Sequence, residues 1–584
     1  MFIPRRSVGL LLMVGLALAA ILPSAGTHVG AAAVRGAPTA ETKLFLPFVR
    51  GGGGVARTPV ILLPGIGGSQ LVNDAGEQWP RVQAIFDSPT DDFLLNLRLA
   101  PDGVSPFDAA DPVYTTTRPV NILRLETVRV GPFSNVSDFY NTTITSFEAA
   151  GYQLNQTLFP WPYDWRKDIE LNAGLLIQFI DQVRTTTGAA RVDLVGHSQG
   201  GLVTLVALAN PASSGKIRKA VTLGAPVLGA TRSMALVQYQ FLCFIGDQGS
   251  CFLHKPTLQT VLRNFPSAYE LMPGAAFDQA VGKVLTLAYD RNTDGVDDGP
   301  LAYEQWLAIV AAERNSALAD RNRAFHERYD TFVPADATTQ VVRVIGSNVA
   351  TIQSITEDQV CPGNGQPCYF EYTTTTGTGD GTVPLHAADL CNAATGFDRR
   401  AGVPNKLFSG VDHGALPTNG GVLDFVKGYL ADTVSISPSA ACETLPRTAP
   451  QRAVELELHG PLAATLADAH GRRFLPAATD APPALHYTDL GPSQSLYFTD
   501  ENTFTAELRV TDARALRVRV NSFSDWARQT SATFDLAADD APVGARLTIS
   551  FAAGQAPAAL RLLVDRDGDG TVDARLAPST TAQP

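Results

Sequence analysis

The chain has 584 residues, a length at which one hydrophobic core stops growing, so we expect at least two domains. Hydrophobic residues make up 45% of the sequence and charged residues 17%, which is typical of a globular protein and excludes an intrinsically disordered one. The net charge of −12 argues against a nucleic-acid-binding surface.

The first 25 residues are typical of a secretory signal peptide. Arg5 and Arg6 precede an apolar run from Val8 to Leu22, and small residues follow it. The run is short for a membrane span and no comparable run follows, although an uncleaved N-terminal anchor is the alternative. We therefore expect a secreted or cell-surface protein without a transmembrane segment after cleavage, and a flexible segment over residues 26–57.

An apolar strand beginning at Pro59 runs into a glycine-rich loop, with the sequence PVILLPGIGGSQL. A dinucleotide site would need Gly-x-Gly-x-x-Gly at the start of a helix, and this loop has a different spacing. It suits an early loop that donates a backbone N–H to an oxyanion. We predict Gly67 as that donor, with Ile66 as the alternative.

A segment dense in aromatic residues and prolines, FPWPYDWR, ends at Arg166. Asp164 and Arg166 can pair and fix the turn that contains Trp165, so we interpret the segment as structural support for the site. Direct contact of Trp161 or Trp165 with a substrate is the alternative.

The sequence Gly-His-Ser-Gln-Gly at 196–200 follows a short apolar run and precedes apolar residues at helical spacing. Strand, sharp turn and helix around Gly-x-Ser-x-Gly are typical of a nucleophile elbow, in which glycines leave room for the tight turn. We predict Ser198 as a nucleophile at a helix N-terminus, with the N–H of Gln199 as the second oxyanion donor. His197 is expected to point away from the reaction and to pack with hydrogen-bonded partners.

A serine nucleophile needs a base and an orienting acid. In hydrolases with such a nucleophile elbow, the three residues follow along the chain in the order Ser, Asp or Glu, His. Asp380 lies between two glycines after a strand-like run, where an acid or a solvated turn would both fit. His413 follows the last strand-like run of this part of the chain, whereas His386 follows Asp380 closely and should lead into a helix. We predict His413 as the base, with His386 as the alternative.

Residues 227–330 form a long insertion with helical patterns, and we expect a cap or lid there. Apolar residues in it could line an acyl-chain site, although a place in the core of the cap is the simpler interpretation for each: Phe241, Leu242, Phe244, Ile245 and Phe252.

Six cysteines in an exported chain suggest disulfides, for which many pairings are possible. Pairing by proximity gives Cys243–Cys251 and Cys361–Cys368, which leaves Cys391–Cys442.

The segments PVILLPGIGGSQL, PWPYDWR, GHSQGG and GDGTVP occur in this order, and together they resemble the lecithin:cholesterol acyltransferase family over about residues 59–430. The resemblance implies an α/β-hydrolase fold and acyl transfer from a lipid ester, through an acyl-serine, to water or an alcohol. It also favours Asp380 as the acid over a solvated turn. Gln199 stands where the family often has Leu, and Gly67 where the eukaryotic enzymes have a larger residue.

The composition changes near Cys442. A linker over 435–450 precedes short alternating segments, punctuated by Gly, Pro and Asp, that are typical of an all-β sandwich over 451–584. The sequence thus predicts an α/β-hydrolase domain over 58–434 and a β-sandwich domain without a catalytic set. That second domain is either a passive accessory or a module that binds a surface or another ligand.

Two acidic loops have EF-hand-like spacing but lack the glutamate that closes such a loop. Their oxygen ligands suit structural Ca²⁺, with a solvated acidic turn as the alternative, and triad catalysis itself needs no cofactor. The first loop holds Asp565, Asp567, Asp569 and Asp573, and the second, weaker one holds Asp290, Asn292, Asp294 and Asp298.

The sequence therefore favours a secreted serine acyltransferase or acyl hydrolase that acts on a lipid ester at a membrane or lipid-particle surface. A general carboxylesterase or triacylglycerol lipase is the alternative enzyme. A non-catalytic binding protein on a hydrolase scaffold is the alternative of another class, and the intact Ser, Asp and His set argues against it.

Overall fold

A computed structural model describes residues 57–582, apart from 82–83, 85–87, 89, 108–117, 125–127, 131–132, 137–138, 240–254, 362–367, 439–441, 443–451, 477–484, 500–502 and 553–554. The expected signal peptide, nearly all of the segment 26–57 and most of the expected linker lie outside these residues. So do Cys243, Cys251 and the candidate acyl-chain residues between 241 and 252.

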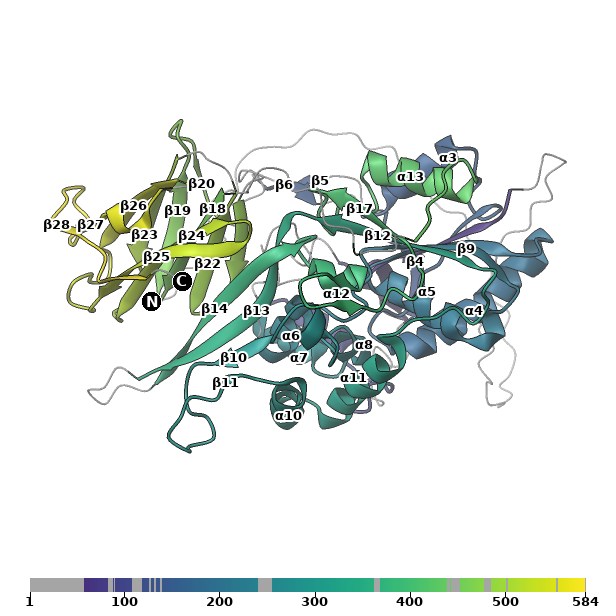
Figure 1. Ribbon diagram of the computed structural model, residues 1–584, viewed down its shortest axis with the longest axis horizontal. Helices are drawn as coiled ribbons and strands as arrows, with labels where there is room; N and C mark the ends of the chain where they lie inside the picture. The colour runs from purple at the N-terminus through teal and green to yellow at the C-terminus, as the bar shows by residue number, and fades with distance from the viewer. Residues whose placement is uncertain are drawn as a thin grey trace, which may run out of the picture. The chain divides into compact units, whose positions relative to one another are not determined.

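The part of the chain before Cys442 is built on a six-stranded sheet in the order β17-β12-β9-β8-β1-β7, in which all neighbours run parallel (Figure 1). All six residues of β8 are buried, as expected for a parallel strand whose two faces are both covered. The six strands are β1 Val60–Leu63, β7 Leu158–Pro160, β8 Val192–His197, β9 Ile217–Leu223, β12 Gln340–Ser347 and β17 Asn405–Ser409.

Alternate side chains of β1 enter two different hydrophobic cores, because successive residues of a strand point to opposite faces. Val60 and Leu62 pack in the core that also contains side chains of α3 (Asn141–Ala149) and α13 (Gly420–Leu430). Ile61 and Leu63 pack in the core that contains α4 (Ile169–Thr187) and α5 (Gln199–Ala209). The sheet is therefore sandwiched between helices, which is the α/β-hydrolase arrangement that the sequence predicted (Figure 1).

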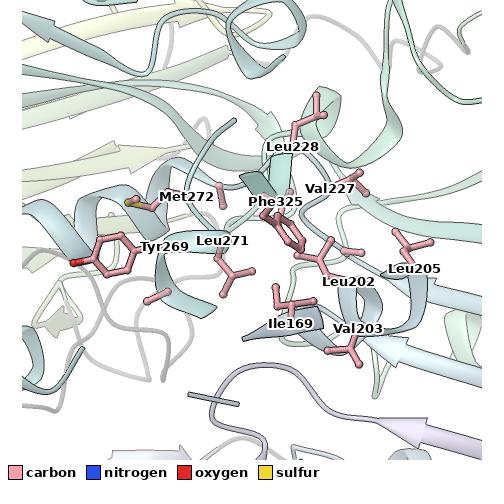
Figure 2. Close-up of a cluster of buried hydrophobic side chains, with 14 of the residues drawn as sticks. Ile169, Leu202, Val203, Leu205, Val227, Leu228, Tyr269, Leu271, Met272 and Phe325 are labelled. Atoms are coloured by element: carbon pink, nitrogen blue, oxygen red, sulfur yellow. The ribbon is translucent and has the colours of Figure 1, made fainter. Parts of the chain in front are cut away.

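The predicted insertion between β9 and β12 is largely helical and shares the core of α4 and α5. Figure 2 shows Leu271 and Phe325 of the insertion in one cluster with Leu202 of α5. Its elements are α6 Thr231–Tyr239, α7 Lys255–Leu262, α8 Pro266–Glu270, α9 Phe277–Ala280, β10 Leu285–Leu287, β11 Gly299–Pro300, α10 Tyr303–Glu313 and α11 Ser316–Tyr329.

A second excursion, between β12 and β17, carries a long hairpin of β13 (Val349–Val360) and β14 (Tyr369–Gly379). The hairpin forms a four-stranded sheet with β10 and β11.

The remaining elements before Cys442 are short. They are β2 Ser69–Asn73, β3 Gly76–Trp79, η1 Asp92–Leu97, β4 Arg118–Ile122, β5 Val128–Val130, β6 Phe133–Val136, η2 Pro211–Ser213, α12 Leu385–Asp389, β15 Cys391–Asn392 and β16 Phe397–Asp398.

The C-terminal part of the chain forms two six-stranded antiparallel sheets, in the orders β21-β22-β18-β24-β25-β29 and β20-β19-β23-β26-β27-β28 (yellow-green in Figure 1). Side chains of both sheets, such as Leu456 and Leu547, pack in one shared core, so the sheets form a sandwich. Their elements are β18 Arg452–His459, β19 Leu462–Ala467, β20 Arg473–Phe474, β21 Leu485–Asp489, β22 Ser493–Phe498, β23 Thr503–Val510, β24 Leu516–Ser524, β25 Ala527–Leu536, β26 Arg546–Ala552, η4 Pro557–Ala559, β27 Leu562–Asp565, β28 Ala574–Leu576 and β29 Thr580–Ala582.

Two disulfides confirm two of the three expected pairings. Cys361 bonds to Cys368 between the strands of the long hairpin, and Cys391 bonds to Cys442. Within the described ranges, none of the helices combines the length and the apolar character needed to cross a membrane.

Candidate active site

Ser198 lies at the turn between β8 and α5 with φ 53° and ψ −123°, a backbone conformation that costs energy for any residue with a side chain. Two glycines make this turn possible. A Cβ on Gly196 would lie 2.4 Å from the carbonyl oxygen of Gly200, and a Cβ on Gly200 would lie 2.3 Å from that of Pro64. Position 196 therefore needs a glycine because helix α5 lies too close for a side chain. Position 200 needs one because the backbone at the end of β1 lies too close.

Ser198, His413 and Asp380 form a continuous hydrogen-bonded chain. The distance from His413 Nε2 to Ser198 Oγ is 2.9 Å, and that from His413 Nδ1 to Asp380 Oδ2 is 2.8 Å. A carboxylate only accepts hydrogen bonds, so Nδ1 carries the proton and Nε2 is free to accept the serine proton. Asp380 is almost fully buried, and its Oδ1 accepts backbone N–H groups from Thr382 and Val383.

The three side chains meet at the carboxyl ends of parallel strands, where loops from distant parts of the chain converge. Ser198 follows β8 and His413 follows β17, whereas Asp380 follows β14 of the long hairpin. The N–H of His413 donates to the carbonyl oxygen of Asp380 over 2.7 Å, which fixes the two loops to each other.

The alternative base has a different neighbour, while His413 holds the contact with Ser198. His386 lies in α12, and its Nδ1 is 3.4 Å from a carboxylate oxygen of Asp389.

Gly224 is a site residue that the sequence did not single out. It follows β9 with φ +58°, and a Cβ there would lie 3.0 Å from both Asp380 Oδ2 and His413 Nδ1. Its sequence signal is the Leu-Gly-Ala-Pro turn directly after a buried strand.

The glycine-rich loop after β1 packs directly against the elbow. A Cβ on Gly65 would lie 2.9 Å from Ser198 Cβ. Gly67 has φ 72°, and its carbonyl oxygen accepts a 2.7 Å hydrogen bond from the indole of Trp79. Among the described residues, the backbone N–H groups of Gly67 and Gln199 have no acceptor, so both can serve a ligand.

The aromatic segment FPWPYDWR braces this loop. Tyr163 Oη donates to the carbonyl oxygen of Pro64 over 2.8 Å, and Trp165 Nε1 donates to that of Ser69 over 3.1 Å. The side chain of Gln199 donates to the carbonyl oxygen of Trp165 over 2.9 Å. Trp161 and Trp165 are buried in the large hydrophobic core, which fits the structural role.

Asp164 and Arg166 form the ion pair that the sequence suggested, with a distance of 2.7 Å between Oδ2 and an Arg166 guanidinium nitrogen. Burial alone would raise the pKa of Asp164, but the charge and hydrogen bonds of Arg166 hold it below its usual value. Arg166 also donates to the carbonyl oxygen of Leu97, which extends the brace to η1.

His197 is hydrogen-bonded at both ring nitrogens, as expected of a packed histidine, and its ring lies beside that of His413, with the centroids 4.9 Å apart. Its Nδ1 lies 2.8 Å from Tyr140 Oη, and its Nε2 lies 2.9 Å from the carbonyl oxygen of His413. Burial, together with the nearby charge of His413 when protonated, lowers the pKa of His197 to about 3. Tyr140 was not among the predicted site residues, because its contact spans 57 positions of the chain.

The first acidic loop brings oxygens together. Ligand atoms of Asp565, Asp567 and Asp573 lie within 4.8 Å of one another, while Asp569 accepts the N–H of Thr571. Such a set of carboxylate oxygens fits a hard cation such as Ca²⁺.

The second loop is closed by hydrogen bonds among its own groups. Asp290 accepts the N–H groups of Asp294 and Gly295, and Asp298 accepts the side-chain amide of Asn292. Within the described chain its acids do not gather as those of the first loop do. Calcium at either loop stays a prediction.

Residues 129–298 match the family model described as lecithin:cholesterol acyltransferase, a stretch that contains Ser198 and ends before Asp380 and His413. A human protein named lysosomal phospholipase A and acyltransferase is 25% identical over 410 residues, covering 64% of this chain and 90% of the human one.

Solved structures give weaker likenesses. Lipase BlEst2 of Bacillus licheniformis in its propeptide form has a TM-score of 0.31 at 10% identity, covering 85% of this chain and 94% of that one. Its mature form has a TM-score of 0.28 at 12% identity, covering 66% and 95%. The fold is assigned from the strand order and the elbow. The chain is thus similar to the lecithin:cholesterol acyltransferase family over residues 129–298, and to the human relative over most of that protein's length.

Proposed function

We propose that this protein is a serine-dependent acyltransferase or acyl hydrolase that acts on lipid esters. The observation that carries the proposal is the hydrogen-bonded chain from Ser198 through His413 to Asp380 at a strained nucleophile elbow. The match to the family model and the name of the human relative support a lipid ester, such as a phospholipid, as the acyl donor.

In the first half-reaction, Ser198 Oγ attacks the ester carbonyl carbon while its proton passes to His413 Nε2. Asp380 holds His413 in the required tautomer and stabilises its charged form. The N–H groups of Gly67 and Gln199 bind the oxyanion, with Ile66 as the alternative to Gly67. Collapse of this intermediate breaks the ester C–O bond, and His413 gives its proton to the leaving alcohol.

The second half-reaction releases the acyl group from Ser198. Water or an acceptor alcohol attacks the acyl-serine and loses its proton to His413. The bond to Ser198 Oγ then breaks, and His413 returns the proton to the serine. Water yields a free fatty acid, and an alcohol yields a new ester. A secreted or cell-surface enzyme would meet such lipids at a membrane or lipid-particle surface.

Product analysis by mass spectrometry tests the proposal. Purified protein and its Ser198→Ala variant receive vesicles of mixed phospholipid and triacylglycerol, with and without a long-chain alcohol. Phospholipid consumption that needs Ser198 supports the proposal, and new esters of the alcohol identify transferase activity. Consumption of triacylglycerol or soluble esters alone would make the protein a lipase or a general carboxylesterase. A folded Ser198→Ala variant with full activity would contradict the serine mechanism.

A matched pair of histidine variants tests the base. His413→Ala should lose several orders of magnitude in kcat, because no other group accepts the serine proton. His386→Ala removes the same side chain from α12 and should keep most of the activity. A fluorophosphonate probe that fails to label Ser198 in the wild-type protein would favour a non-catalytic scaffold.

A further inference from the structure

Three separate parts of the site meet at Tyr140 and His197, neither of which takes part in the reaction proposed above. Tyr140 precedes α3, and its buried hydroxyl accepts the N–H of Gly65 over 2.7 Å. The same hydroxyl contacts His197, which stands next to Ser198 and contacts the backbone of His413.

The direction of each hydrogen bond follows from what each group can donate. The carbonyl oxygen of His413 only accepts, so the proton of a neutral His197 is on Nε2. Nδ1 then has only a lone pair to offer, and the hydroxyl of Tyr140 must donate to it. This leaves an oxygen lone pair of Tyr140 for the N–H of Gly65. The hydrogen bonds therefore all point the same way, each from donor to acceptor, from the N–H of Gly65 through Tyr140 and His197 to the carbonyl oxygen of His413.

The protonation states agree with this direction. Burial raises the pKa of Tyr140 far above its ordinary value, so its hydroxyl keeps the proton that it donates. His197 is neutral at physiological pH, because burial and the neighbouring His413 ring, 4.9 Å away between centroids, lower its pKa.

This chain of hydrogen bonds joins the parts of the site whose relative positions matter for acyl transfer. Gly65 begins the loop that carries the candidate oxyanion donor, and it lies against the Cβ of Ser198. The carbonyl of His413 belongs to the base itself. The helix that begins after Tyr140 also contacts the base loop farther on, where Thr143 Oγ1 donates to the carbonyl oxygen of Pro417.

We propose that Tyr140 is a positioning residue which, through His197, holds the oxyanion loop and the backbone of the base in register with Ser198. The inference rests on the proposed function, since it concerns the same acyl-transfer site. Displacements of about 1 Å at such a site can cost on the order of a hundredfold in rate.

Tyr140→Phe removes only the hydroxyl and tests this role. In assays of the full chain with a soluble p-nitrophenyl ester, we expect kcat to fall roughly ten- to a hundredfold while KM changes little. The rate of fluorophosphonate labelling at Ser198 should fall in parallel. Tyr152→Phe is the matched control, because Tyr152 is buried in the same core and its hydroxyl faces Arg57 instead of the site. It should keep the wild-type kcat.

His197→Gln and the double variant test the path through His197. If both residues act in one chain, the double variant Tyr140→Phe/His197→Gln should lose no more than about the worse single variant. Fully multiplicative losses would overturn the path. A wild-type kcat in folded Tyr140→Phe, or a loss no larger than in Tyr152→Phe, would overturn the positioning role. A wild-type protein that neither turns over esters nor labels at Ser198 would instead overturn the proposed function, and the inference with it.

Discussion

Glycines surround Ser198, His413 and Asp380 because backbone segments at the ends of three strands approach one another there. Gly65 follows β1, Gly196 lies within β8, and Gly224 follows β9. At each of them a Cβ would come within about 3 Å of a neighbouring atom of the elbow or of the triad. Glycine is needed at these positions for steric reasons, because parallel strands converge at one edge of the sheet and leave no room for a side chain.

Gly224→Ala should reduce activity more than it reduces stability. The new Cβ would press on the hydrogen bond between Asp380 and His413, so we expect kcat to fall at least about tenfold. The positive φ adds a backbone cost of about 1 kcal/mol to the free energy of folding. Gly215→Ala is the control, because Gly215 has φ +73° and nothing within 4 Å of an added Cβ. Equal kcat values for the two folded variants would contradict the steric account.

His197 should make the protein sensitive to mild acid. Its pKa falls from 6.5 to about 3 on folding, so its contribution to stability is complete above pH 6.5 and is lost as the pH falls towards 3. In that window the unfolded chain binds one more proton at this residue. His197→Gln should therefore reduce the slope of unfolding free energy against pH by about 1.4 kcal/mol per pH unit. Denaturant unfolding at several pH values measures the slope, and an unchanged slope would contradict the prediction.

At the scale of elements, local patterns predicted the strands and turns that carry chemistry. The apolar run at 192–195 and the helical spacing after Ser198 correspond to β8 and α5. Ser198 and His413 could be proposed because each lies in a short motif after a strand-like run, and Asp380 because the family resemblance favoured an acid over a solvated turn. Tyr140 could not, because its partners Gly65 and His197 belong to other elements and are brought to it only by tertiary packing.

The aromatic segment before α4 is a brace whose hydrogen bonds reach β2, η1, the elbow and the insertion. Ser267 of α8 donates to the carbonyl oxygen of Trp165, the same atom that accepts from Gln199. Asp164 and Arg166 fix the turn between these contacts. The brace therefore couples the position of the elbow to the packing of the insertion.

Arg166→Met should destabilise the protein by about 3 kcal/mol, because it leaves the carboxylate of Asp164, whose side chain is only 14% exposed, without its charge partner. The double variant Asp164→Asn/Arg166→Met removes the uncompensated charge and should recover part of this loss. Arg323→Met is the control for an exposed pair, with Glu304, and should cost less than about 1 kcal/mol. Chemical denaturation measures all three. Equal losses for Arg166→Met and Arg323→Met would show that burial does not matter here.

At the scale of the whole molecule, the change of composition near Cys442 marks a change of architecture. Helices and parallel strands precede it, and two antiparallel sheets with a core of their own follow it. Alternating apolar residues predicted these later strands, since a half-buried strand exposes every second side chain. The order of the strands within the two sheets was not predictable, because it depends on pairings between distant segments.

Calcium should stabilise the protein without changing its chemistry. The buried carboxylate of Asp565 and its neighbours Asp567 and Asp573 offer oxygens close enough to share one ion. At about a hundred times its Kd, Ca²⁺ would add about 2.7 kcal/mol to the unfolding free energy, which thermal unfolding shows as a rise in Tm over the protein in EDTA. Asp565→Asn should abolish the Ca²⁺-dependent rise, whereas Asp290→Asn in the second loop should leave most of it. Because each variant is compared with itself in EDTA, hydrogen bonds lost from the loop do not affect the comparison.

The kcat should be the same with and without Ca²⁺, since the triad needs no metal. An absent rise in Tm would identify the first loop as a solvated acidic turn, and a rise that survives Asp565→Asn would place the ion elsewhere.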